Sequence, residues 1–197
     1  MADQFDRDPD VGAAVTPARS EQGTTILEVL VASALLVTLM AGLMAMSSLA
    51  ISTTENQGHL AARATEYAQD KMEQLLALQY GDAVTDTRTF PAGTTGGSGL
   101  ATGGSYNVDS PVATYVDYLD QNGNQCGSTG AVCAAPTGTT PPTGWFYVRA
   151  WKIDDHSTDA TLPANLKRIA GGAATNRGFG GTTRAASYLT VLKTSPF

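Results

Sequence analysis

The strongest pattern in the chain is a long apolar run that begins near residue 24. Residues 24–52 have the sequence TTILEVLVASALLVTLMAGLMAMSSLAIS, in which Glu28 is the single ionisable residue. A helix of about 20 apolar residues crosses the hydrocarbon core of a bilayer. The run therefore predicts a transmembrane half-helix over residues 24–52. A buried core helix is the alternative, although such helices are normally shorter and amphipathic.

Helical periodicity continues beyond the apolar run. Residues 53–80 lack proline and place apolar residues three or four positions apart, which predicts an amphipathic helix half with one apolar stripe. Gly81 is the expected stop, and Gly42 and Gly58 are the expected positions of a bend. The two halves together would form a helix roughly 85 Å long. The predicted stripe consists of Ala61, Ala64, Ala68, Met72, Leu75 and Leu76, and the residues predicted to lie off it are Arg63, Glu66, Asp70, Glu73 and Gln74.

Beyond residue 80 the chain becomes rich in threonine, glycine and proline, with short segments of alternating polarity. This pattern predicts a β-rich head over residues 81–197 with long surface loops. The apolar stripe needs a folded partner, so we expect one face of an antiparallel sheet to cover it. The predicted fold class is therefore α+β, with a long N-terminal helix packed against the sheet. The predicted strands are residues 87–90, 106–109, 113–119, 145–153, 166–170 and 187–193.

Residues 1–23 are polar, contain two prolines and show no apolar period, so we expect a leader that lies outside the fold. The whole chain has 197 residues, a net charge of -6 and 42% hydrophobic residues, which suits one modest globular domain beside the helix. It has no lysine-rich run and therefore lacks the electrostatic footprint of nonspecific nucleic-acid binding. Nucleic acid is not an expected partner.

Cys126 and Cys133 are the two cysteines of the chain, and they lie seven positions apart in a loop-like segment. The spacing favours a disulfide over a zinc site, because His59 and His156 are remote and a second cysteine pair is missing. A disulfide would indicate an oxidising compartment. It would close a short loop and contribute roughly 2–3 kcal/mol in the chain-entropy model. Two unpaired small apolar side chains are the alternative.

Catalytic motifs do not stand out in the sequence. The chain lacks G-x-S-x-G, H-E-x-x-H and the phosphate-binding G-x-x-x-x-G-K-[ST], so we expect no enzyme, no cofactor and no metal site. His156 lies beside two aspartates, but a solvated loop explains it better. Asp117, Asp120, Asn122 and Asn124 resemble part of a calcium loop without its later glutamate. Because Asn-Gly is a common hairpin pair, a turn is the favoured interpretation there.

The segment QGTTILEVLVASALLVTLMAGLMAM, with Gly23 before the apolar run and Glu28 fifth after that glycine, is a specific combination. It resembles the amino-terminal signature of type IV prepilins and type II secretion pseudopilins. The following ARATEYAQDKMEQLLAL resembles the same region of minor pilins of the PilV kind. Gln22 and Thr24 depart from the family, which usually has a basic residue before the glycine and phenylalanine after it.

The resemblance implies a filament subunit that is a substrate rather than an enzyme. A prepilin peptidase of the membrane aspartic type would cleave between Gly23 and Thr24, and its methylase activity would act on the new amine of Thr24. The helices would then pack into the core of a type IV pilus or a secretion pseudopilus, with a minor pilin favoured. Glu28 would take part in assembly, because its carboxylate is costly in apolar surroundings unless the Thr24 amine of another subunit neutralises it.

Topology follows from the basic residues near the apolar run. Arg7 and Arg19 precede it and Arg63 follows it, which favours a leader in the cytoplasm and a single pass through the bacterial inner membrane. The head and the filament would lie in the periplasm or at the cell surface. A secretory signal peptide fits poorly, because its apolar core spans only about 7–15 residues. The alternative from another class is a signal-anchored envelope protein whose head binds a ligand or calcium.

Overall fold

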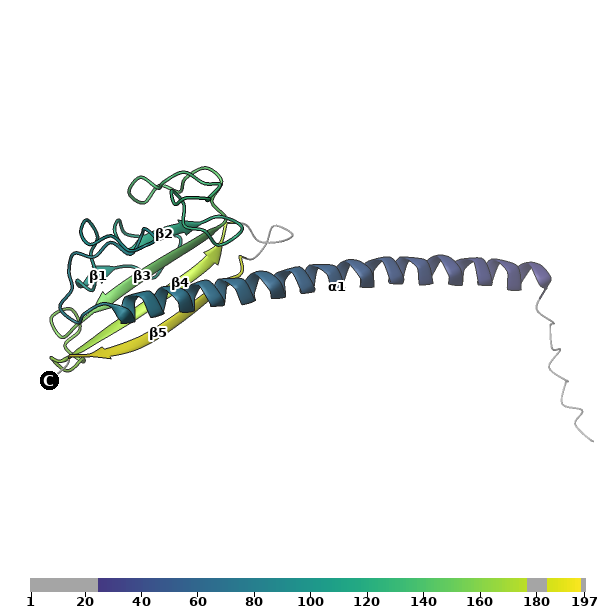
Figure 1. Ribbon diagram of the computed structural model, residues 1–197. Helices are drawn as coiled ribbons and strands as arrows, with labels where there is room; N and C mark the ends of the chain where they lie inside the picture. Colours follow the sequence, from purple (N-terminus) through teal and green to yellow (C-terminus); the bar gives the residue numbers. More distant parts are fainter. Residues whose placement is uncertain (1–24, 177–183, 196–197) are drawn as a thin grey trace, which may run out of the picture. The chain divides into compact units, whose positions relative to one another are not determined.

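The computed structural model describes residues 25–176 and 184–195. The predicted leader and the predicted cleavage site at Gly23 and Thr24 lie outside these residues. The described residues form one long helix, α1 (Ile26–Ala77), followed by a five-stranded antiparallel sheet (Figure 1). An α+β fold with an N-terminal helix and an antiparallel sheet was predicted, and the structure confirms it at that level.

Helix α1 begins and ends differently from the predicted bounds. At its start, the backbone N–H of Glu28 lies 3.3 Å from Oγ1 and 2.9 Å from the carbonyl oxygen of Thr25, so Thr25 is the N-cap. The helix continues through both Gly42 and Gly58. It ends at Ala77 rather than near Tyr80. Directly after Ala77, the N–H of Leu78 donates to the carbonyl of Leu75 in a tighter turn.

Side chains from the sheet satisfy carbonyl groups at the end of α1. Lys193 Nζ donates to the Leu76 carbonyl, and Lys167 Nζ donates to the carbonyls of Tyr80 and Leu100. The last turn of α1 contains no basic residue of its own. These lysines therefore supply the positive charge that stabilises a helix C-terminus.

The sheet is built around its central strand β3. The strand order is β1-β3-β4-β5, and β2 also pairs with β3. β3 thus pairs with β4 along one edge and with β1 and β2 along the other, and every pairing is antiparallel. The strands are β1 (Gly103–Gly104), β2 (Val116–Leu119), β3 (Tyr147–Asp154), β4 (Leu166–Thr175) and β5 (Ala186–Thr194).

Two of the predicted strands are wrong. Residues 87–90 lie in a turn, in which Asp86 accepts hydrogen bonds from the backbone and side chain of Arg88 and forms a bridge with Gly93. Residues 106–109 also turn, because the Asn107 side chain accepts the N–H of Asp109. In both segments a polar side chain satisfies the backbone locally, so the alternating pattern does not produce a strand.

Strand β4 extends beyond the predicted residue 170, through Gly171 and Gly172. A Cβ atom on Gly171 would lie 2.0 Å from Cε of Met72 on α1. A Cβ atom on Gly172 would lie 2.6 Å from Cε1 of Tyr188 on β5. These glycines therefore serve close packing on the two faces of the sheet rather than chain reversal.

The C-terminal part of α1 lies across one face of the sheet, as Figure 1 shows. Ala64, Ala68, Met72 and Leu75 are buried as predicted, whereas Ala61 and Leu76 are exposed. The prediction for those two was wrong, because the buried line runs through Ala64, Ala68, Lys71, Met72 and Leu75 and does not extend to Ala61 or Leu76. The core on this face contains Met72, Leu75, Leu100, Tyr115, Trp151, Ile153 and Ile169. A second core on the opposite face contains Val108, Val116, Tyr118, Cys126, Cys133, Val148, Ala150 and Ala174.

Candidate functional site

The N-terminal part of α1 presents large apolar side chains to its surroundings. Every residue from Ile26 to Ser52 is exposed. Contiguous apolar surface of this size marks an interaction with a membrane or another protein. The helix is long and apolar enough to cross a membrane.

The hydroxyl groups of Ser33 and Thr38 in this part of α1 are satisfied by the helix itself. Ser33 Oγ donates to the Leu30 carbonyl at 3.0 Å, and Thr38 Oγ1 donates to the Leu35 carbonyl at 2.8 Å. Such bonds remove the cost of placing a hydroxyl in a medium without water. These polar residues are therefore compatible with apolar surroundings.

Glu28 is the exception in this segment. Thr25 and Glu28 have the spacing of a capping box, in which the first residue accepts the N–H of the fourth. Glu28 also lies in the first turn of α1, where the helix dipole favours a carboxylate. Within the described residues its carboxylate makes no hydrogen bond or ion pair. The group is thus available to a partner outside this part of the chain.

A buried cluster of charged side chains joins α1 to the sheet, and the sequence did not predict it. Lys71 Nζ donates to Oδ2 of Asp117 at 2.7 Å and to the Thr87 carbonyl at 2.7 Å. Arg149 binds Asp117 with two nitrogens, at 2.8 and 2.9 Å, and reaches Asp70 Oδ2 at 2.7 Å. Lys71 Nζ also lies 4.0 Å from the centre of the Trp151 ring. The side chains of Lys71, Asp117 and Arg149 are all buried.

Burial shifts the titration of this charge cluster. It lowers the pKa of Lys71 to about 8, against the opposing attraction of Asp117. Burial alone would raise the pKa of Asp117, but the charges of Arg149 and Lys71 hold that pKa below its ordinary value.

One signal in the sequence points to the cluster. Lys71 shares the three-to-four spacing of Ala64, Ala68 and Leu75, and a cation on an apolar stripe needs a buried acid.

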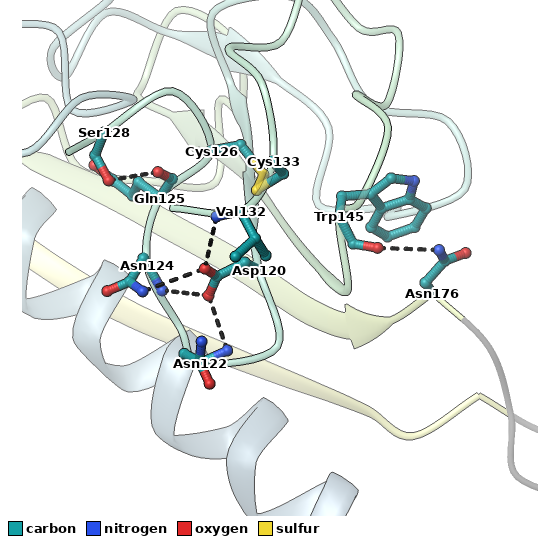
Figure 2. The surroundings of a disulfide bond; sticks show 10 residues. All are labelled: Asp120, Asn122, Asn124, Gln125, Cys126, Ser128, Val132, Cys133, Trp145 and Asn176. Carbon is teal, nitrogen blue, oxygen red and sulfur yellow. Dashed lines mark hydrogen bonds between the residues drawn. A yellow bond between two sulfur atoms is a disulfide. The ribbon is translucent and has the colours of Figure 1, made fainter. Parts of the chain in front are cut away.

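The disulfide loop lies on the opposite face of the sheet. Cys126 and Cys133 are joined, as their spacing predicted, with their Cα atoms 4.9 Å apart. Beside them, the Asp120 carboxylate accepts the backbone N–H groups of Asn122, Asn124 and Val132 (Figure 2). The N–H of Gly123 donates to the Asp120 carbonyl, as the turn interpretation of this segment predicts. The chain itself therefore occupies this carboxylate.

No group of three or more histidine, cysteine, aspartate or glutamate side chains in the described part of the chain is arranged to hold a metal ion. His156 Nδ1 lies 2.5 Å from the Leu162 carbonyl, a contact that orders its loop.

The chain matches no protein-family model, no curated protein and no solved structure.

Proposed function

We propose that this chain is a pilin-like structural subunit, closest in kind to a minor type IV pilin, that joins a filament through the N-terminal part of α1. One observation carries the proposal. An exposed apolar helix segment holds a single carboxylate, Glu28, whereas the rest of the same helix is packed on an antiparallel sheet. A carboxylate costs about 3 kcal/mol at the centre of a membrane helix and less near the helix end, where Glu28 lies, so burial of this charge in a bundle of helices calls for a positive partner.

The disulfide and the basic residues support the proposed topology. A disulfide persists in oxidising compartments, which favours a head outside the cytoplasm. Arg7 and Arg19 favour a leader on the cytoplasmic side. The subunit would be held in the bacterial inner membrane by one span and then extracted into the filament.

Processing would prepare the pairing partner of Glu28. Cleavage between Gly23 and Thr24 by prepilin peptidase creates a positive amine on Thr24, directly before the N-cap residue Thr25. In a staggered bundle of helices, the amine of one subunit would lie against the Glu28 carboxylate of its neighbour. Each charge then neutralises the other in apolar surroundings.

The substitution Glu28→Gln tests this role and separates it from helix capping. Glutamine serves in a capping box as glutamate does, so the start of α1 should stay intact. We expect the variant to insert and to be cleaved, with Thr24 as first residue by intact-mass analysis, but to be missing from sheared filaments. Glu55→Gln, on the same helix beyond the apolar segment, is the matched control and should assemble normally.

Two results would overturn the proposal. Normal incorporation of Glu28→Gln into filaments would show that the charge has no assembly role. A mature chain that begins at Met1 and stays a monomer in the membrane would favour a signal-anchored envelope protein. If Thr24 is the first residue, two deletion strains identify the filament system. One lacks the type IV pilus machine and the other lacks the type II secretion machine, and the filament disappears in the strain that lacks its own machine.

A further inference from the structure

A cavity of about 560 Å³ opens on the head between α1, β3 and two loops. Its volume falls within the range of small-molecule sites, about 300–1,000 Å³. The cavity lies entirely within the compact unit that contains the sheet. The lining residues that matter for recognition are Asp70, Gln74, Phe90, Asn124, Ser128 and Arg149.

The polar side chains that line the cavity leave several oxygen acceptors free within the described part of the chain, and the amides of Gln74 and Asn124 each keep a second N–H as well. Asp70 Oδ2 accepts Arg149 Nη1 at 2.7 Å and Gln74 Nε2 at 2.9 Å. Asn124 Nδ2 donates to Asp120 at 3.2 Å. Among the described residues, Asp70 Oδ1, Gln74 Oε1 and Asn124 Oδ1 accept no hydrogen bond. A ligand that supplies hydroxyl or N–H donors would complement these three oxygens.

The wall of the cavity is held in place by the buried charge cluster. Arg149 is buried and fixed by two bonds to Asp117, which in turn binds Lys71. Asp70 is thus oriented from behind by Arg149 and from the side by Gln74. A site whose polar groups are already oriented loses little entropy when a ligand binds.

An aromatic ring stands at the rim of the same cavity. Phe90 is 74% exposed, which is unusual for a residue of its size in a folded head. It borders both this cavity and a second one of about 400 Å³ beside the disulfide loop. An exposed phenyl ring beside free oxygen acceptors suits a ligand with one apolar C–H face and hydroxyl groups at its edge.

Charge favours a neutral ligand. Asp70 and Arg149 neutralise each other at the cavity wall, and Asp86 and Arg88 do the same at the second cavity. The Asp70 carboxylate, whose Oδ1 accepts no hydrogen bond among the described residues, disfavours an anionic group. We propose that the head binds a neutral saccharide in this cavity, with Phe90 stacked on the sugar ring and Asp70, Gln74 and Asn124 accepting its hydroxyl protons. This proposal does not depend on filament assembly.

The test uses the full chain in micelles of an amine-oxide detergent, because detergents with sugar headgroups would compete. The probe is an array of immobilised neutral and acidic mono- and disaccharides. We expect binding to at least one neutral saccharide and competition by the same free sugar. Gln74→Ala and Phe90→Ala should each weaken that binding about tenfold or more.

Matched controls keep the test specific to the cavity. Gln69→Ala, on the exposed side of α1, and Tyr188→Ala, on the opposite face of the sheet, should bind as the unchanged chain does. Thermal unfolding of each variant verifies the fold, and Gln74→Ala changes a side chain outside the buried charge cluster. Binding to none of the saccharides, binding to acidic saccharides alone, or binding that survives both cavity substitutions would each overturn the proposal.

Discussion

Helix α1 contains two segments that differ in burial, although they belong to one continuous helix. The first is Ile26–Ser52 and the second is residues 53–77. Leu43 in the first segment is 66% exposed, whereas Leu75 in the second is fully buried. The first segment is apolar on all sides, and the second carries one apolar stripe interrupted by Lys71. The comparison shows that the second segment has its packing partner within this chain. Under the proposed function, the partners of the first segment are the membrane and the helices of other subunits.

The two ends of α1 differ in the same way. Its start is capped by Thr25, the residue directly before the helix. At its end, the Leu76 carbonyl accepts a hydrogen bond from Lys193, and three residues beyond the end the Tyr80 carbonyl accepts one from Lys167; both lysines are far away in the sequence. The start is thus stabilised locally, whereas the end depends on the folded sheet.

The largest expected change in the free energy of unfolding comes from breaking the charge cluster that joins the second segment of α1 to the sheet. Asp117→Ala would leave Lys71 buried without its acid and Arg149 with Asp70 alone, which should lower the free energy of unfolding by about 3–5 kcal/mol. Urea unfolding followed by the fluorescence of the two tryptophans measures it. Glu66→Ala, which removes an exposed pair with Arg63, should change stability by less than about 1 kcal/mol. Equal effects of the two substitutions would contradict a structural role for the cluster.

A matched pair of leucines tests the comparison directly. Leu75→Ala should cost the head about 3 kcal/mol, because it opens a cavity against Trp151 and Ile153. Leu43→Ala makes the same chemical change in the same helix and should leave urea unfolding of the head unchanged. If Leu43→Ala destabilised the head as much as Leu75→Ala, the two segments would not have separate partners.

Alkaline pH should reveal the buried lysine. Folded Lys71 loses its proton near pH 8, whereas the unfolded side chain keeps it to about 10.5, so the unfolded state binds more protons in this window. The contribution of Lys71 to the free energy of unfolding should therefore rise between about pH 8 and pH 10.5, by at most about 3 kcal/mol. It is measured as the difference in unfolding free energy between the unchanged chain and Lys71→Met. Tyr67 and Tyr147, whose pKa values burial raises, are present in both and cancel. A difference that does not vary with pH would be contrary to this prediction.

The smallest expected effect is at the start of α1. Thr25→Ala removes the side-chain acceptor for the N–H of Glu28 and should cost about 1 kcal/mol in the first turn. Hydrogen exchange at the Glu28 amide should become about fivefold faster in micelles. Ser33→Ala also removes a hydroxyl, but one that caps nothing, and should leave this amide unchanged. The same acceleration in both variants would argue against capping by Thr25.

Local chemistry explains what the sequence determined by itself. The apolar run identified the helix, because nothing but helical hydrogen bonding satisfies so long an apolar segment. Four of the six predicted strands, at residues 113–119, 145–153, 166–170 and 187–193, overlap β2, β3, β4 and β5, and they followed from alternating polarity. The close spacing of Cys126 and Cys133 was enough to predict their disulfide. Each of these features depends on residues that are near one another in the chain.

Only the tertiary structure decided which distant residues meet. Gly171 and Gly172 lie in β4 beyond the predicted end of that strand, where Met72 and Tyr188 pack closely against them. Lys71, Asp117 and Arg149 come from a helix and two strands, and no local pattern joins them. The cavity beside Phe90 likewise needs α1, β3 and two loops in place. The physical reason is that burial of a charge and the shape of a cavity depend on surfaces brought together by folding, whereas periodicity depends on neighbours along the chain.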